Sequence, residues 1–271
     1  MNGGGVLLGL PAALAIFGAG VAAGAVNSVA GGGTLLSFPI LLWLGRDPIV
    51  ANVSNAVALC PGSLASAFAF RRELGAAPRL LAALLPASIV GAMFGAWLLL
   101  ATPQRWFAHL VPGLILLATL LLAFKRPLLA GFSAAFARDA GPGPGAAAPP
   151  ERRPLAGLAI GQLFVAIYGG YFGAAMGIMM LASLALAGVD DIHQRNGLKN
   201  ATSAVINLVA GLFFAWRGAV DWSDAACLGA GAILGGYVGG ALGRKLPARV
   251  AEGLVVAIGL AAALTQVLRR R

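Results

Sequence analysis

The chain has 271 residues, of which 59% are hydrophobic and only 10% charged, and its mean hydropathy is +0.88. Soluble domains carry about 25% charged residues, so this composition excludes an ordinary soluble domain, a disordered chain and a disulfide-rich scaffold. The net charge of +10 comes from short basic clusters between apolar runs, which is typical of loops in membrane proteins. No nucleic-acid-binding motif accompanies these clusters, and we therefore expect no nucleic-acid partner.

Ten apolar runs follow one another along the chain, and eight of them reach the length of about 20 residues that a helix needs to cross a bilayer. The runs at 34–44 and 178–187 would cover only about 15–18 Å as helices and cannot cross alone. The sequence therefore predicts an all-α polytopic membrane protein with eight long transmembrane helices and two short half-helices. The runs lie at 6–30, 34–44, 49–70, 79–101, 106–124, 155–177, 178–187, 192–216, 225–243 and 250–268.

A Pro- and Gly-rich stretch at 125–153 separates two halves of nearly equal length. Its composition predicts a polar, unpacked linker, and its basic residues place it in the cytoplasm. The expected organisation is a first transmembrane repeat at 6–124, this linker, and a second transmembrane repeat at 154–268.

The two halves resemble each other at an offset of 145 residues, and the short runs fall in register. Such halves are typical of transporters built from structural repeats. We expect inverted repeats with both termini outside, because this places the basic loops at 71–79 and 244–249 in the cytoplasm. The basic tail at 269–271 would then lie outside, which disagrees with this orientation. Equivalent pairs include Gly24 and Gly169, Gly32 and Gly177, Asn55 and Asn200, Gly91 and Gly236, and Gly95 and Gly240.

Three consecutive glycines, Gly31, Gly32 and Gly33, lie between the first two runs, and each destabilises a helix by roughly 1 kcal/mol relative to alanine. We expect a discontinuous helix whose second half begins at Thr34 and directs its free N–H groups toward a substrate anion. Close helix packing through small residues is the alternative. If the break is functional, alanine at Gly32 should impair activity more than alanine at Gly95, and equal effects would favour packing. The substrate-binding residues predicted here are Asn27, Gly31, Gly32, Gly33, Thr34 and, in the second half, Gly177.

Polar residues gather near the start of the runs at 49–70 and 192–216. If the second of these helices starts near Asp191, Lys199 lies about 12 Å along it, inside the hydrocarbon region, where a charge is costly and is taken as functional. Ammonium, amide and hydroxyl donors suit an anion. The alternative is a loop that extends to Lys199 and lets its side chain reach the membrane surface. The substrate-binding residues predicted here are Asn52, Ser54, Asn55, Lys199, Asn200 and Thr202.

The acidic residues all lie in loops or near the ends of runs, which argues against a proton or cation relay made of carboxylates. No catalytic or metal-binding motif occurs, so we expect neither enzymatic activity nor a cofactor or metal. Two other hypotheses stay open at this point: a channel-like or structural membrane scaffold, and a permease for a non-anionic solute.

Residues 24–39, with the sequence GAVNSVAGGGTLLSFP, and residues 51–56, 169–177 and 200–203 carry a resemblance to a known family. At these motifs the chain resembles the sulfite exporter TauE/SafE family, and the resemblance extends over nearly the whole chain outside the linker. It implies a multi-pass permease of the bacterial inner membrane for small sulfur-containing anions such as sulfite, sulfoacetate or other organosulfonates. With the repeats, it predicts alternating access, with a small anion and the lipid bilayer as partners, while the oligomeric state is left open.

Overall fold

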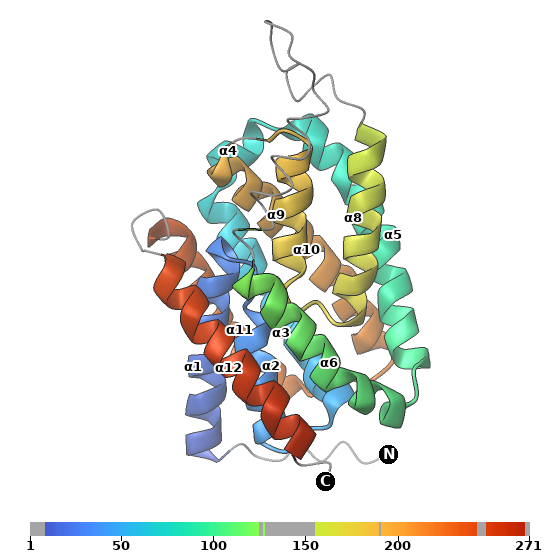
Figure 1. The fold of residues 1–271 in the computed structure, drawn as a ribbon, viewed down its shortest axis with the longest axis vertical. Helices are drawn as coiled ribbons and strands as arrows, with labels where there is room; N and C mark the ends of the chain where they lie inside the picture. Colours follow the sequence, from blue (N-terminus) through green and yellow to red (C-terminus); the bar gives the residue numbers. More distant parts are fainter. Residues whose placement is uncertain (1–8, 125–126, 128–154, 190, 243–247, 269–271) are drawn as a thin grey trace, which may run out of the picture.

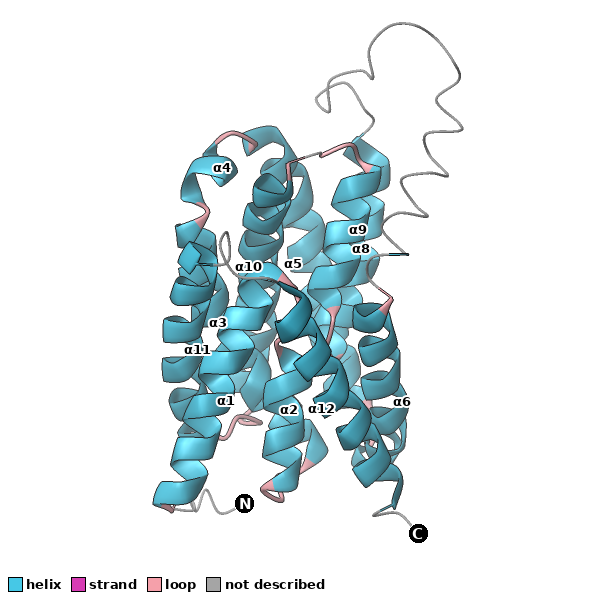
Figure 2. Cartoon of the chain, turned by 60° about the vertical axis from the view of Figure 1, so that its left-hand side comes forward, coloured by secondary structure: helices cyan, strands magenta, loops and turns pink. Residues whose placement is uncertain are grey.

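The structure is a computed structural model that describes residues 9–124, 127, 155–189, 191–242 and 248–268. All regular elements in these ranges are helices (Figures 1 and 2), which confirms the predicted all-α class. Apart from Pro127, the predicted linker lies outside the described residues. So do residues 243–247 of one basic loop and the basic tail at 269–271.

Eleven helices are described, six before the linker and five after it. The first group is α1 (Leu10–Val29), α2 (Thr34–Trp43), α3 (Pro48–Ala69), α4 (Arg71–Gly75), α5 (Pro78–Ala101) and α6 (Gln104–Ala123). The second group is α8 (Leu155–Tyr171), α9 (Met176–Leu186), α10 (Ile192–Trp216), α11 (Trp222–Leu242) and α12 (Ala248–Leu268).

Five of the described helices, α1, α3, α5, α6 and α10, are long and apolar enough to cross a membrane. The predicted total of eight long spans therefore stays a prediction. The two short runs do form the short helices α2 and α9. The run expected at 155–177 ends as a helix at Tyr171, because the chain turns there before α9 begins.

The chain reverses direction after α1 and again after α8. Gly33 lies directly against α1, since a Cβ atom built on it would be 2.3 Å from the carbonyl oxygen of Ala23. Figure 2 shows α2 beside the lower part of α1, and in Figure 1 α9 lies beside α8 at the opposite end of the molecule. Each half therefore contains a helical hairpin whose tip lies inside the bundle.

Small residues let the two halves approach closely, with α1 packing on α11 and α5 packing on α8. A Cβ atom on Gly24 would lie 2.4 Å from the Ala232 carbonyl oxygen, and one on Gly95 would lie 2.1 Å from the Ile167 carbonyl oxygen. At Gly32 the nearest atom is a leucine methyl group at 3.4 Å. The backbone that faces Gly95 cannot move aside, whereas the leucine side chain that faces Gly32 can. We therefore expect alanine to lower the stability of the protein more at Gly95 than at Gly32. This expectation concerns stability, and the larger loss of activity expected at Gly32 stays a prediction.

Candidate functional site

The first break separates α1 from α2. The N–H groups of Ala30 and Gly31 both donate to the Val26 carbonyl oxygen, at 2.7 and 3.3 Å, and so end α1. Gly31 then adopts φ of +83°, which residues with a side chain rarely adopt. Helix α2 begins at Thr34 without a side-chain cap on its N-terminus. The predicted discontinuous helix is therefore present.

The second break separates α8 from α9 and uses different residues. Gly173 has φ of +75°, and Ala175 has φ of 61°, a left-handed conformation that costs a non-glycine residue on the order of 1 kcal/mol or more. The Tyr168 hydroxyl donates to the Ala174 carbonyl oxygen at 2.8 Å and holds the turn. The N-terminus of α9 also has no side-chain cap.

The two breaks touch each other at a pair of glycines. A Cβ atom on Gly31 would lie 2.7 Å from the Gly177 carbonyl carbon, and one on Gly177 would lie 2.7 Å from the Gly31 Cα atom. The first N–H groups of a helix have no partner within that helix. Since Gly31 lies just before α2 and Gly177 in the first turn of α9, the N-termini of both short helices meet inside the bundle.

The C-termini of the interrupted helices are capped by side chains from other helices. The Lys199 ammonium group donates to the carbonyl oxygens of Asn27 and Ser28, at 2.7 and 3.0 Å. The Asn200 amide donates to the same Ser28 oxygen at 3.0 Å. At the other break, the Asn52 amide donates to the Tyr171 carbonyl oxygen at 2.9 Å.

Lys199 is completely buried, and its ammonium group points toward the first break. The alternative in which this side chain reaches the membrane surface therefore does not fit the geometry. A cation at the C-terminus of a helix offsets the partial negative charge of the helix dipole there. Lys199 thus brings a positive charge to the break and also neutralises the end of α1.

This arrangement makes the meeting point of the breaks attractive to an anion. The negative C-terminal ends are covered by donors, whereas the positive N-termini of α2 and α9 have no capping side chain. The complete helices α3 and α10 differ, because Asp47 and Asp191 accept hydrogen bonds from their first N–H groups. Uncapped helix N-termini bind anions through N–H groups and dipole together.

Several residues predicted for the site hold neighbouring helices together. The Ser54 hydroxyl accepts from the Asp221 N–H at 2.9 Å, and the Asn55 carboxamide oxygen accepts from the Ser37 hydroxyl at 2.5 Å. The Thr202 hydroxyl lies 3.5 Å from the Met180 sulfur of α9 and also donates to the Leu198 carbonyl oxygen of its own helix at 2.8 Å. The predicted residues that the structure brings to the breaks are Asn27, Gly31, Gly32, Gly33, Thr34, Asn52, Gly177, Lys199 and Asn200.

An aromatic cluster beside the second break was not anticipated from the sequence. The ring of Phe172 lies 5.3 Å from that of Phe38 and 6.3 Å from that of Phe107, both edge to face. Tyr168 joins the cluster at 6.4 Å. The only sequence signal was the spacing of Tyr168 and Phe172 by four residues, which places them on one helix face. Phe38 belongs to α2, so this cluster joins the two hairpins.

An ion pair joins the two halves, and it was also not anticipated from the sequence. Arg46 follows α2, and its Nε and Nη2 atoms lie 2.6 and 3.0 Å from the two carboxylate oxygens of Asp224 in the first turn of α11. The Asp224 side chain is only 2% exposed. The hydrogen bond to Asp224 raises the pKa of Arg46, so the guanidinium group stays charged. At the offset of 145, the equivalent positions hold Asp191 and Arg79, and both are exposed.

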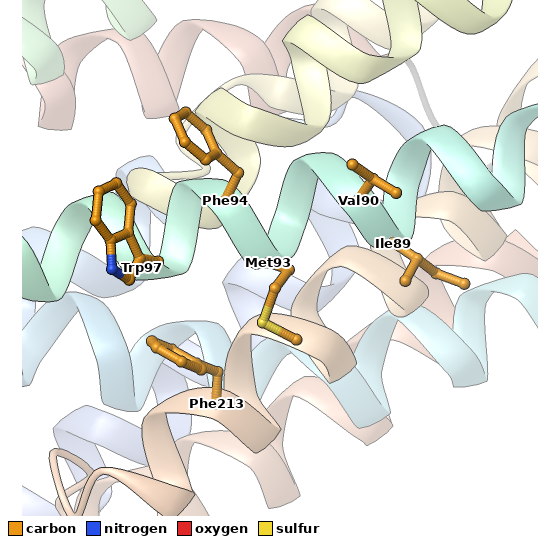
Figure 3. A pocket seen from close by; sticks show the side chains of 6 residues that line it. All are labelled: Ile89, Val90, Met93, Phe94, Trp97 and Phe213. Atoms are coloured by element: carbon orange, nitrogen blue, oxygen red, sulfur yellow. The ribbon is translucent and has the colours of Figure 1, made fainter.

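A shallow groove of about 490 Å³ lies away from the breaks, on the outer face of α5 and α10 (Figure 3). Figure 3 shows Met93 and Trp97 of α5 beside Phe213 of α10. The lining side chains are hydrophobic, which suits lipid, and none of them is charged; the indole N–H of Trp97 is the one polar group that they carry. Among the described residues, no group of three His, Cys, Asp or Glu side chains is placed to hold a metal ion. The groove is lined by Ile89, Val90, Met93, Phe94, Trp97 and Phe213.

The fold and the paired breaks define the class as a polytopic helical membrane protein with discontinuous helices, an arrangement characteristic of transporters. The chain belongs to the sulfite exporter TauE/SafE family, whose sequence profile matches residues 16–265, as the motifs predicted. It is therefore a membrane transporter.

Two relatives have similar lengths and related names. One is the "Probable membrane transporter protein" of Haemophilus influenzae, 25% identical over 86% of this chain and 85% of the relative. Another is the "Probable membrane transporter protein YfcA" of Escherichia coli K12, 27% identical over 83% of this chain and 79% of the relative. No solved structure matches the chain at a significant level.

Proposed function

We propose that this transporter moves small sulfur-containing anions, such as sulfite, sulfoacetate or other organosulfonates, across the bacterial inner membrane. The observation that carries the proposal is the contact between two uncapped helix N-termini, at Gly31 and Gly177. Helix N-termini favour negative charge, and Lys199 adds a full positive charge beside them. The family name, sulfite exporter, supports the choice of sulfur-containing anions.

The proposed binding site combines backbone and side-chain groups. The N–H groups of Gly32, Gly33, Thr34 and Gly177 provide the donors, and Thr34 adds a hydroxyl group. The N–H of Gly31 already donates to the Val26 carbonyl oxygen, so Gly31 contributes the turn. Lys199 provides the charge. Asn27 and Asn200 lie at the first break and Asn52 at the second, where they would surround the anion. Ser54, Asn55 and Thr202 support the site by fixing α3 and α10 against their neighbours.

The proposed mechanism is alternating access between two inverted repeats. The hairpin α1–α2 and the hairpin α8–α9 approach from opposite ends of the bundle (Figure 1), as an inverted repeat requires. Lys199, Asn200 and Asn52 are all at most 3% exposed, which corresponds to a closed conformation. Opening the site toward the end of the molecule that carries Arg46 and Asp224 would separate this pair. Opening it toward the other end would keep the pair intact.

Transport by purified protein in proteoliposomes tests the proposal. We expect saturable flux of labelled sulfite that sulfonates inhibit and that cations of similar size leave unchanged. Flux that rises linearly with concentration would instead support a channel. Lys199→Ala should lower the flux at least tenfold, and Gly113→Ala, at a helix position with open space around it, is the matched control. A folded Lys199→Ala protein with normal flux would remove Lys199 from the mechanism.

A further inference from the structure

Two buried side-chain oxygens near the first break have no hydrogen-bond donor among the described residues. They are the carboxamide oxygens of Asn196 and Asn200. The two residues are 4% and 0% exposed, so bulk water does not reach them in this conformation. Buried acceptors are nearly always satisfied in native proteins, and each exception calls for a ligand, an ordered water or a functional reason.

The position of the Asn200 oxygen is fixed by its own amide group. The Nδ2 atom donates to the Ser28 carbonyl oxygen at 3.0 Å, at the C-terminus of α1. Exchanging the oxygen and nitrogen atoms of this carboxamide would bring two acceptors together, so the assignment is unambiguous. The Asn200 oxygen therefore lies beside the break, next to the residue that supplies the positive charge.

Asn196 lies one turn earlier on α10 and on the same face as Asn200, because residues four apart are neighbours on a helix surface. This turn is enclosed by the end of α3, since a Cβ atom on Gly197 would lie 3.4 Å from the Cβ atom of Phe70. Two acceptors thus continue from the break toward the end of the bundle that carries α4.

The site therefore offers acceptors as well as donors. A fully deprotonated oxyanion has only acceptors, and it would leave both asparagine oxygens unsatisfied. An anion with an O–H or N–H group can bind the helix N-termini through its charged oxygens and donate to Asn196 or Asn200. A site built to hydrogen-bond a ligand group discriminates strongly against an analogue that lacks this group.

We propose that the transported anion carries a hydrogen-bond donor of its own and that Asn196 and Asn200 select for it. The substrate class would be hydroxy- or amino-substituted sulfonates and singly protonated oxyanions. This inference rests on the anion transport proposed above. Asn196 and Asn200 then act as specificity residues that accept a hydrogen bond from the substrate.

Two anions of nearly equal size test the inference, 2-hydroxyethanesulfonate and 1-propanesulfonate, which differ by a hydroxyl in place of a methyl group. Each is added as a competitor to the uptake of labelled sulfite by the wild-type protein in proteoliposomes. We expect 2-hydroxyethanesulfonate to inhibit at least about tenfold more strongly, because the methyl group leaves a buried acceptor unpaired. Equal inhibition by the two anions, as expected if a water molecule satisfies the oxygens, would overturn this inference alone.

Variants of α10 assign the selectivity to a residue. Asn196→Leu should reduce the preference to within about twofold, whereas Asn207→Leu, another buried asparagine of the same helix, should preserve it. An unchanged preference in Asn196→Leu would remove Asn196 from the selection. The wild-type comparison does not depend on whether either variant folds. If neither sulfonate nor unlabelled sulfite inhibits uptake, the anion site itself is wrong, and this inference fails with it.

Discussion

The two breaks occupy equivalent positions in the halves, yet they are built from different residues. The first uses three consecutive glycines, and its α1 terminus is capped by Lys199 and Asn200. The second uses Gly173 together with Ala175 in a left-handed conformation, and its α8 terminus is capped by Asn52. The comparison shows that the interruption of the helix is repeated between the halves, while the residues that produce it are not.

The physical basis of each break follows from this difference. Glycine adopts positive φ without a steric penalty, so the first break is compatible with its local sequence. The second break forces an alanine into the same region and depends on tertiary contacts, including the Tyr168 hydrogen bond and the rings around Phe172. The Lys199 ammonium group donates at the first break, and its side chain also lies beside the second, since a Cβ atom on Gly177 would be 3.1 Å from the Lys199 Cδ atom.

The largest effect is expected where the breaks touch. In Gly31→Ala, the new methyl group would meet the backbone of Gly177 at 2.7 Å, at a residue with positive φ. We expect a loss of more than about 4 kcal/mol of stability, or no folded protein, when thermal unfolding is measured in detergent. Gly113→Ala should be neutral or slightly stabilising. A Gly31→Ala protein of normal stability would contradict the contact between the breaks.

The comparison of the two halves extends to the Arg46–Asp224 ion pair and the equivalent positions of the other half. Asp224→Asn leaves Arg46 without its buried partner, and we expect a loss of roughly 3 kcal/mol in the unfolding free energy. At the equivalent position of the other half, Arg79 is exposed, and Arg79→Gln should change stability by less than about 0.5 kcal/mol. Exchanging the charges, with Arg46→Asp and Asp224→Arg together, should recover part of the loss. If the double variant is no better than either single variant, the ion pair does not stabilise the contact between the halves.

The capping groups should also contribute unequally. Lys199→Met removes hydrogen bonds to two buried carbonyl oxygens, whereas Asn52→Leu removes one. We expect the free energy of unfolding to fall by about 2 kcal/mol in Lys199→Met and by about 1 kcal/mol in Asn52→Leu. A hydrogen bond from a charged donor contributes more than one from an amide, but removing a buried charge offsets part of the loss. Thermal unfolding of both variants in the same detergent makes the comparison. A larger loss for Asn52→Leu would mean that the second break is the one that depends more on its cap.

The smallest effect is a gain in stability. In Ala175→Gly, the residue at φ of 61° is replaced by one that adopts this conformation freely. We expect stabilisation by up to about 1 kcal/mol, reduced by the greater freedom of glycine in the unfolded chain. Gly45→Ala is the opposite case, since Gly45 has φ of +80° in open space, and it should be mildly destabilising. A destabilised Ala175→Gly protein would argue that the second break is not strained.

Part of the site could be predicted because it is local. The glycines at 31–33 interrupt a helix by their own conformational preferences, and Lys199 is conspicuous as a charge inside an apolar run. The partners of Lys199 could not be predicted, since they are backbone carbonyl groups of a helix more than 170 residues away. Ser54, Asn55 and Thr202 looked equivalent to Asn52 in the sequence. Only the direction of each side chain decides whether it stabilises a neighbouring helix or contacts a break.

The sequence by itself determined that the chain is helical, embedded in a membrane and divided into two related halves. Long apolar runs prefer lipid to water, and glycine changes the conformation of the backbone around it, so neither effect depends on distant residues. Its motifs also identified the family, which the profile match confirms. Only the tertiary structure decided that the breaks meet, which donors cap them and which charges pair. Those features depend on close approach between distant segments, such as Gly31 with Gly177 and Arg46 with Asp224, and no local preference encodes the partner.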